Sequence, residues 1–143
     1  LIVQGTTGRV EQSGNLISKS LTSPVVDINN GYVTSFVNSG SIHADSAAQQ
    51  AVVTNTGTGL AFTNQTGGSI IGQVNLLTGN NTVTLMQGSE GTDFTTGSGD
   101  DAFILKGLTL ADTGVFTSLN GGTGSDTLTL DSSLYTLSDV NAI

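Results

Sequence analysis

Two glycine-rich segments in the C-terminal half carry the acidic residues best suited to binding a cation. Residues 121–129 (GGTGSDTLT) match the calcium-binding nonapeptide of some β-solenoids, and residues 96–104 (TGSGDDAFI) match it except at the first position. Asp100, Asp101 and Asp126 are the calcium candidates in these segments. Calcium needs about six to eight oxygen ligands, which a β-roll collects from turns about nine residues apart. These two motifs begin at positions 96 and 121, too far apart for a β-roll, so we expect structural corners here and no metal site.

Residues with catalytic potential are few. His43 is the only histidine, and Ser41 and Asp45 flank it merely as sequence neighbours, without a Gly-x-Ser-x-Gly elbow around a nucleophile. The paired carboxylates of Asp100 and Asp101 are reminiscent of glycoside hydrolysis, but adjacent residues of a strand point to opposite faces. The absence of cysteine excludes disulfides and thiolate chemistry. We therefore expect a protein that is not an enzyme and uses no cofactor.

The composition favours an all-β fold with many turns. The chain of 143 residues has 20 Gly, one Pro and only 10% charged residues. So little charge disfavours exposed amphipathic helices, whereas the abundant Val, Ile and Thr suit half-buried strands. Gly and Asn tolerate the positive φ of tight corners. Many short strands joined by turns are the predicted result.

The charge balance limits the partners. The formal net charge is −8, and eight of the 11 acidic residues lie in residues 90–143. This charge excludes nucleic acid and anionic membrane surfaces as expected partners. No apolar run is long enough to span a bilayer as a helix. The sequence shows no signal peptide and does not begin with Met, so we expect it to derive from a longer protein.

A first family of repeats occupies the N-terminal half. Three pairs of identical residues are each separated by 26 positions: Val26 and Val52, Phe36 and Phe62, and Asn38 and Asn64. Gly14 precedes Gly40 by the same interval and marks an earlier, partial copy. The corner residues predicted from this family are Asn38, Gly40, Asn64 and Gly68.

A second family of repeats follows in the C-terminal half. Residues 79–85, 99–105 and 124–130 share the pattern Gly-x-Asn/Asp-x-apolar-x-Leu, with spacings of 20 and 25. Each copy reads as a turn followed by a strand with alternate apolar residues. The predicted corner residues are Gly79, Asn81, Gly99, Asp101, Gly124 and Asp126.

Repeats of this length predict a right-handed parallel β-helix, that is, a β-solenoid. Each strand would pair with its counterpart one coil away at about 4.8 Å, so that Asn stacks on Asn and Phe on Phe. A β-sandwich has no need of such offsets. We expect one segment over residues 1–143, with regular coils of about 26 residues over 12–75 and less regular coils over 76–131. Residues 132–143 break the repeat and are expected to form a partial cap, and uncapped ends favour self-association.

The repeat phrases resemble those of a known family. Residues 38–42 (NSGSI), 64–70 (NQTGGSI), 77–83 (LTGNNTV) and 121–128 (GGTGSDTL) resemble the β-helical passenger domains of Gram-negative autotransporters, the type V secretion proteins. The resemblance covers about residues 12 to 131. It implies a longer protein with a signal peptide and a C-terminal membrane β-barrel. It also implies that the passenger crosses the outer membrane unfolded and then folds at the cell surface.

The resemblance further implies roles in adhesion, virulence and surface display, with an autochaperone region in the C-terminal part of the passenger. The expected partners are the rest of the passenger, its membrane barrel and a host or cell-surface ligand. Two alternatives stay open: a calcium-binding, RTX-like β-roll module of a secreted protein, and a fragment of a polysaccharide-processing β-helix enzyme. Any function beyond support is expected first in residues 86–131, which hold the acidity and the irregular coils.

Overall fold

The computed structural model describes residues 1–3, 8–28, 32–54, 56–87, 93–107, 116 and 118–131. All regular secondary structure in these ranges is β-strand, and no helix that could span a membrane occurs in them. The segment 132–143, for which a cap was expected, lies outside the described residues.

The strands of the described residues form three parallel sheets. Sheet A contains β1 (Ile2–Val3), β4 (Val26–Ile28), β7 (Gln50–Thr54), β10 (Gln73–Asn75), β12 (Asp93–Thr95) and β14 (Ser118–Asn120). Sheet B contains β2 (Arg9–Gln12), β5 (Ser35–Asn38), β8 (Ala61–Asn64), β11 (Thr82–Met86), β13 (Ala102–Lys106) and β15 (Thr127–Asp131). Sheet C contains only β3 (Asn15–Ile17), β6 (Ser41–His43) and β9 (Ser69–Ile71).

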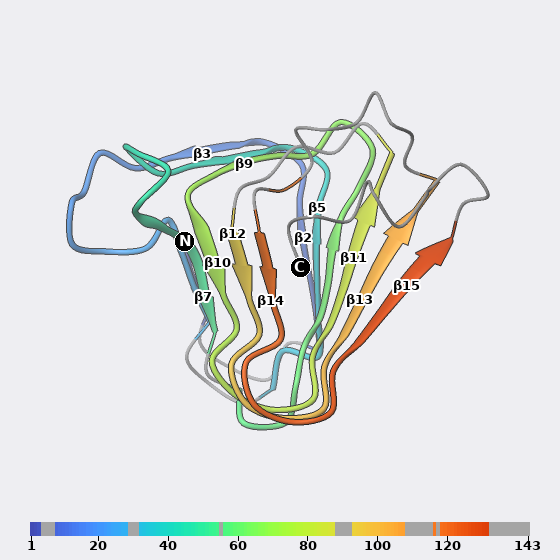
Figure 1. Ribbon diagram of the computed structural model, residues 1–143. Helices are drawn as coiled ribbons and strands as arrows, with labels where there is room; N and C mark the ends of the chain where they lie inside the picture. Colours follow the sequence, from blue (N-terminus) through green and yellow to red (C-terminus); the bar gives the residue numbers. More distant parts are fainter. Residues whose placement is uncertain are drawn as a thin grey trace.

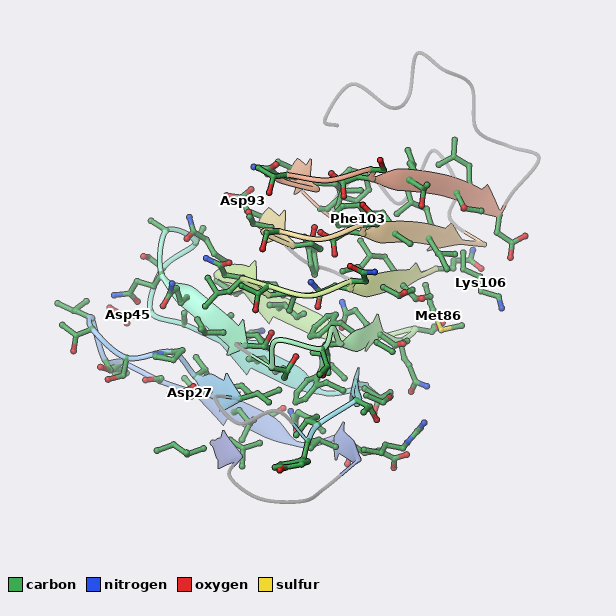
Figure 2. The ribbon with its side chains drawn as sticks, turned by 90° about the horizontal axis from the view of Figure 1, so that it is seen from below. Asp27, Asp45, Met86, Asp93, Phe103 and Lys106 are labelled. Atoms are coloured by element: carbon green, nitrogen blue, oxygen red, sulfur yellow. The ribbon has the colours of Figure 1, made fainter. Side chains whose placement is uncertain are left out.

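The chain winds through these sheets as a parallel β-solenoid. Sheets A and B form two facing walls, and the strands of sheet C cross between them at the top of the view (Figure 1). A quarter turn shows the coils stacked in chain order, with Phe103 inside the stack and Met86 and Lys106 at its outer edge (Figure 2). The predicted all-β parallel β-helix is confirmed.

Strand registers follow the repeat offsets of the sequence. The first family pairs as Val26 with Val52, Phe36 with Phe62 and Asn38 with Asn64. The second pairs as Thr82 with Ala102 and Ala102 with Thr127, the same two offsets that separate its sequence copies. Between the two families, sheet C ends at β9, and a single residue, Gly72, separates β9 from β10. In the described residues, no strand of sheet C follows β9.

The core is the continuous column of side chains between the two walls. Phe36 and Phe62 are fully buried and stacked, with ring centroids 5.6 Å apart and planes 8° from parallel. Phe62 also meets Phe94 of the facing wall edge-on, at 6.0 Å and 62°. Removing such a buried ring costs about 3–5 kcal/mol, so each ring stabilises the coils on both sides of it.

Tight corners bring the backbones of successive coils into contact. Gly97 has φ of 89°, and a Cβ atom there would overlap the carbonyl group of Leu77, its counterpart one coil earlier. Leu77 has a positive φ of 54° itself. Gly67 also has a positive φ, 78°, but a Cβ there would meet nothing within 4 Å. A comparison of Gly97 with Gly67 therefore separates the free-energy cost of steric overlap between coils from the cost of a left-handed backbone.

We expect Gly97→Ala to destabilise the protein much more than Gly67→Ala. Both substitutions place Ala in the left-handed region, at a cost of roughly 1–2 kcal/mol. Only Gly97→Ala also forces two coils apart, which adds roughly 1–3 kcal/mol. Urea denaturation followed by circular dichroism measures both losses. Equal losses would show that the coils do not depend on close approach at this corner.

Candidate functional site

The first cluster of polar side chains lies at the corner between sheets B and C. Asn38 Nδ2 donates to Asn64 Oδ1 at 2.8 Å and to the Gly40 carbonyl at 3.1 Å. Gln12 occupies the same position one coil earlier, and its Nε2 donates to the Gly14 carbonyl at 2.6 Å. The two asparagines are fully buried. This column satisfies the backbone of a sharp corner, which leaves little free hydrogen-bonding capacity for a ligand.

Gly40 and Gly68 complete this corner. A Cβ at Gly40 would overlap the Gly14 carbonyl, and one at Gly68 would lie 2.5 Å from Asn64 Oδ1. Asn64 Nδ2 donates to the Gly68 carbonyl at 3.1 Å. The four residues predicted from the first repeat family therefore lie together, and they bind one another.

In the later coils, leucine replaces asparagine at this position. Asn64 pairs with Leu85, Leu85 with Leu105 and Leu105 with Leu130. A leucine cannot hydrogen-bond the backbone of a corner, and sheet C has no strand after β9 in the described residues. Strands β11, β13 and β15 are instead longer by one residue than β2, β5 and β8. This change from Asn to Leu coincides with the end of sheet C in the described residues, and sequence reasoning missed it.

The second polar cluster is an inner column at the corner between sheets A and B. Asp101 Oδ1 accepts from the backbone N of Asn81 at 2.7 Å and from its Nδ2 at 3.1 Å. Asp126 Oδ1 accepts from the backbone N of Asp101 at 3.0 Å, and Asn81 Oδ1 accepts from the backbone N of Leu60 at 2.9 Å. Asn81 and Asp101 are buried, whereas Asp126 is exposed. Each side chain thus ties its own coil to the preceding one.

An outer column runs beside it on the exposed side of the corner. Asn80 Oδ1 accepts from the backbone N of Asp100 at 3.0 Å, and Asp100 Oδ1 accepts from the backbone N of Ser125 at 2.9 Å. Asp100 is exposed, whereas Asp101 is buried. The two adjacent carboxylates bind different backbone groups and do not converge on a shared point. No group of three or more His, Asp or Glu residues within the described ranges is arranged to hold a metal ion.

The glycines predicted for this corner stack with one another. Gly79, Gly99 and Gly124 have φ of 88°, 129° and 136°. A Cβ at Gly99 would lie 2.6 Å from the Gly79 carbonyl oxygen, and one at Gly124 would overlap the Gly99 carbonyl. These three residues and the inner column therefore form one corner repeated over three coils.

His43 lies on β6, half exposed, between Ile17 and Ile71 of the neighbouring strands. Its Nε2 lies 3.1 Å from Ser69 Oγ, one coil away. The structure thus pairs His43 with Ser69, a residue that sequence reasoning did not single out.

A surface pocket of about 300 Å³ lies at the third corner, between sheets C and A. Two loops form its walls, residues 18–25 after β3 and residues 44–49 after β6, and both project from the solenoid (Figure 1). The residues that line it are Ser20, Leu21, Thr22, Ser23, Ala48, Gln49, Gln50 and Gln73. Sequence reasoning missed this pocket. The available signal was the contrast between the two loops and the single Gly72 at the same corner one coil later.

Comparison with protein-family models, curated proteins and solved structures gives no match for this chain.

The hydrogen bonds of the inner column predict how the stability of the protein changes when a carboxylate is replaced with an amide. Asp101 Oδ2 is buried without a hydrogen-bond partner, whereas Asn81 Nδ2, at the equivalent position, donates to the Gly79 and Thr96 carbonyls at 2.7 and 3.1 Å. We expect Asp101→Asn to stabilise the protein by roughly 1–2 kcal/mol, because the new amide supplies a donor in place of an unpaired acceptor.

Thermal unfolding of three variants checks this expectation. The reciprocal change Asn81→Asp should lower the melting temperature, because it removes the donor that Asn81 uses. Asp126→Asn, at the exposed end of the column, should change stability by less than about 0.5 kcal/mol. A melting temperature lowered by Asp101→Asn would mean that the carboxylate, and not the corner shape, is what this position requires.

Proposed function

We propose that this chain is a non-catalytic scaffold segment of a surface-exposed, autotransporter-like passenger. The hydrogen-bonded corner columns carry this proposal. In them, side chains otherwise suited to chemistry, such as Asn38, Asn81 and Asp101, bind the backbone or side chains of adjacent coils. A stack held in this way is a stiff, elongated support. Its partners would be the rest of the passenger, a membrane barrel and a host or cell-surface ligand.

The mode of stacking supports secretion in an unfolded state. Each strand pairs only with its counterparts in the adjacent coils, so the fold can grow coil by coil as chain emerges. No cysteine is present to form a disulfide before or during export. A location on the outside of a Gram-negative bacterium, with a role in adhesion and virulence display, follows from this proposal.

The later coils have the features expected of an autochaperone. Strands β11, β13 and β15 pair over five consecutive positions without a register shift. In contrast, β7 and β10 shift register between Gln73 and Val74. One of these coils, from β11 to β13, is also shorter than the coil from β5 to β8, which slightly lowers the entropy cost of closing it. We propose that these coils fold first and draw the remainder outward.

A display experiment tests the scaffold and autochaperone proposals together. The chain is placed between a signal peptide and a membrane β-barrel, and its arrival on intact cells is measured by protease accessibility. We expect Phe103→Ala to reduce surface yield several-fold, because it destabilises the coils proposed to fold first. Phe36→Ala is the matched control, since it removes a ring that is also buried, at 0% exposure against 3%.

The comparison of the two variants separates the possible results. Equal reductions would contradict an autochaperone in the later coils while leaving the scaffold proposal in place. Failure of the unaltered chain to reach the surface would contradict the secretion proposal itself. Urea denaturation of the purified variants establishes that the two substitutions destabilise the fold to a similar extent.

We also propose that the chain associates with itself through its open ends. In the described residues, β1 and β2 at one end, and β14 and β15 at the other, each pair on one side only, and unpaired edges attract further strands. Deleting residues 132–143, the proposed cap, should raise the mass measured by light scattering. A deletion variant that stays monomeric at high concentration would contradict end-to-end association.

A further inference from the structure

The pocket between sheets C and A has preformed walls. Ser18 Oγ accepts from the backbone N of Ser20 at 3.1 Å, and Ser20 Oγ accepts from the backbone N of Ser23 at 3.2 Å. In the second loop the backbone N of Gln49 donates to the Ser46 carbonyl at 3.1 Å. The Gln49 carbonyl in turn accepts from the backbone N of Gln73 at 2.6 Å. The serine bonds fix the shape of the first loop, and the bond from Gln73 ties the second loop to the first residue of β10.

The lining of this pocket is polar and uncharged. It presents the hydroxyls of Ser20, Thr22 and Ser23 and the side-chain amides of Gln49, Gln50 and Gln73, with Leu21 and Ala48 as its apolar members. Lys19 and Asp45 belong to the same two loops, and Asp45 is seen there in Figure 2, but neither residue lines the pocket.

Two features of the lining point to a ligand. Gln49 Oε1 is buried and has no hydrogen-bond partner, and such an acceptor gains from an O–H or N–H donor. Leu21 is 74% exposed at the pocket, the most exposed of the large apolar side chains in the described residues. A leucine held in water beside hydroxyls and amides suits a ligand that has both polar groups and C–H surfaces.

We propose that this pocket binds a neutral carbohydrate. A sugar hydroxyl donates to Gln49 Oε1, other hydroxyls exchange hydrogen bonds with the serine, threonine and glutamine side chains, and a C–H face covers Leu21 and Ala48. The volume of about 300 Å³ is at the small end for ligand pockets and suits one or two sugar rings. A phosphate or carboxylate would find no opposite charge in this lining. The site goes beyond the scaffold role and does not depend on it.

Titration of the full chain with single sugars tests the proposal. The probes are glucose, galactose, mannose and N-acetylglucosamine, followed by saturation-transfer NMR and calorimetry. At least one should bind with a dissociation constant of roughly 1–10 mM, as expected for a ligand of about a dozen heavy atoms. Glucuronic acid, which adds a negative charge to the same ring, should bind several-fold more weakly than glucose.

Three variants assign the binding to this pocket. Gln49→Ala should weaken it about tenfold by removing the buried acceptor, and it leaves the bond from the Gln73 backbone intact. Leu21→Ala should weaken it about threefold, and so exposed a residue can be replaced without harm to the fold. Gln87→Ala, an exposed glutamine at the end of β11, is the control and should change nothing.

Three outcomes would overturn the proposal. The first is that no neutral sugar binds at about 50 mM, a concentration well above the dissociation constant expected for a ligand of this size. The others are binding that neither Gln49→Ala nor Leu21→Ala weakens, and tighter binding of glucuronic acid than of glucose. If Gln49→Ala does not fold, as judged by circular dichroism, the response to Leu21→Ala decides the matter.

Discussion

The constraint on which this structure depends is parallel stacking, with each residue facing its counterpart one coil away at about 4.8 Å. A side chain in this fold must be compatible with the two residues above and below it. Phe36 stacks on Phe62 and Asn38 bonds to Asn64 for this reason. The same spacing leaves no room for a Cβ at Gly97. It also lets Asp101 be buried, because an N–H of the preceding coil is always within reach of its carboxylate.

One change within a single column accompanies the end of sheet C in the described residues. Where the last residue of the sheet B strand is Asn38 or Asn64, its side chain bonds the backbone beyond it and the chain turns into sheet C. Leu85 at the same position keeps the column apolar, and strand β11 continues for one more residue. The loss of this side-chain hydrogen bond thus coincides with the end of sheet C in the described residues, while the strands of sheets A and B continue to pair with their counterparts one coil away.

The sequence predicted the stacking well, because a repeat offset is itself the strand register of a solenoid. The offsets between the sequence repeats recur in the pairing of Phe36 with Phe62, of Val83 with Phe103 and of Phe103 with Leu128. The sequence predicted less about what each corner does. Asp100 and Asp101 look alike in sequence, yet one is exposed and the other buried, because their environment is set by residues of the neighbouring coils. The pocket was missed for a related reason: no repeat marks it, and two loops from different coils create it.

The pocket lies where two successive coils have long connections between sheets C and A. We expected any function beyond support in residues 86–131, where the acidity is concentrated. The pocket, however, lies between residues of the earlier coils that contain sheet C. In the first two of these coils the loops 18–25 and 44–49 connect sheets C and A, whereas Gly72 alone makes this connection in the third. Loops that lie outside the stacked columns can vary without disturbing the strand pairing, and the proposed sugar site lies between two such loops.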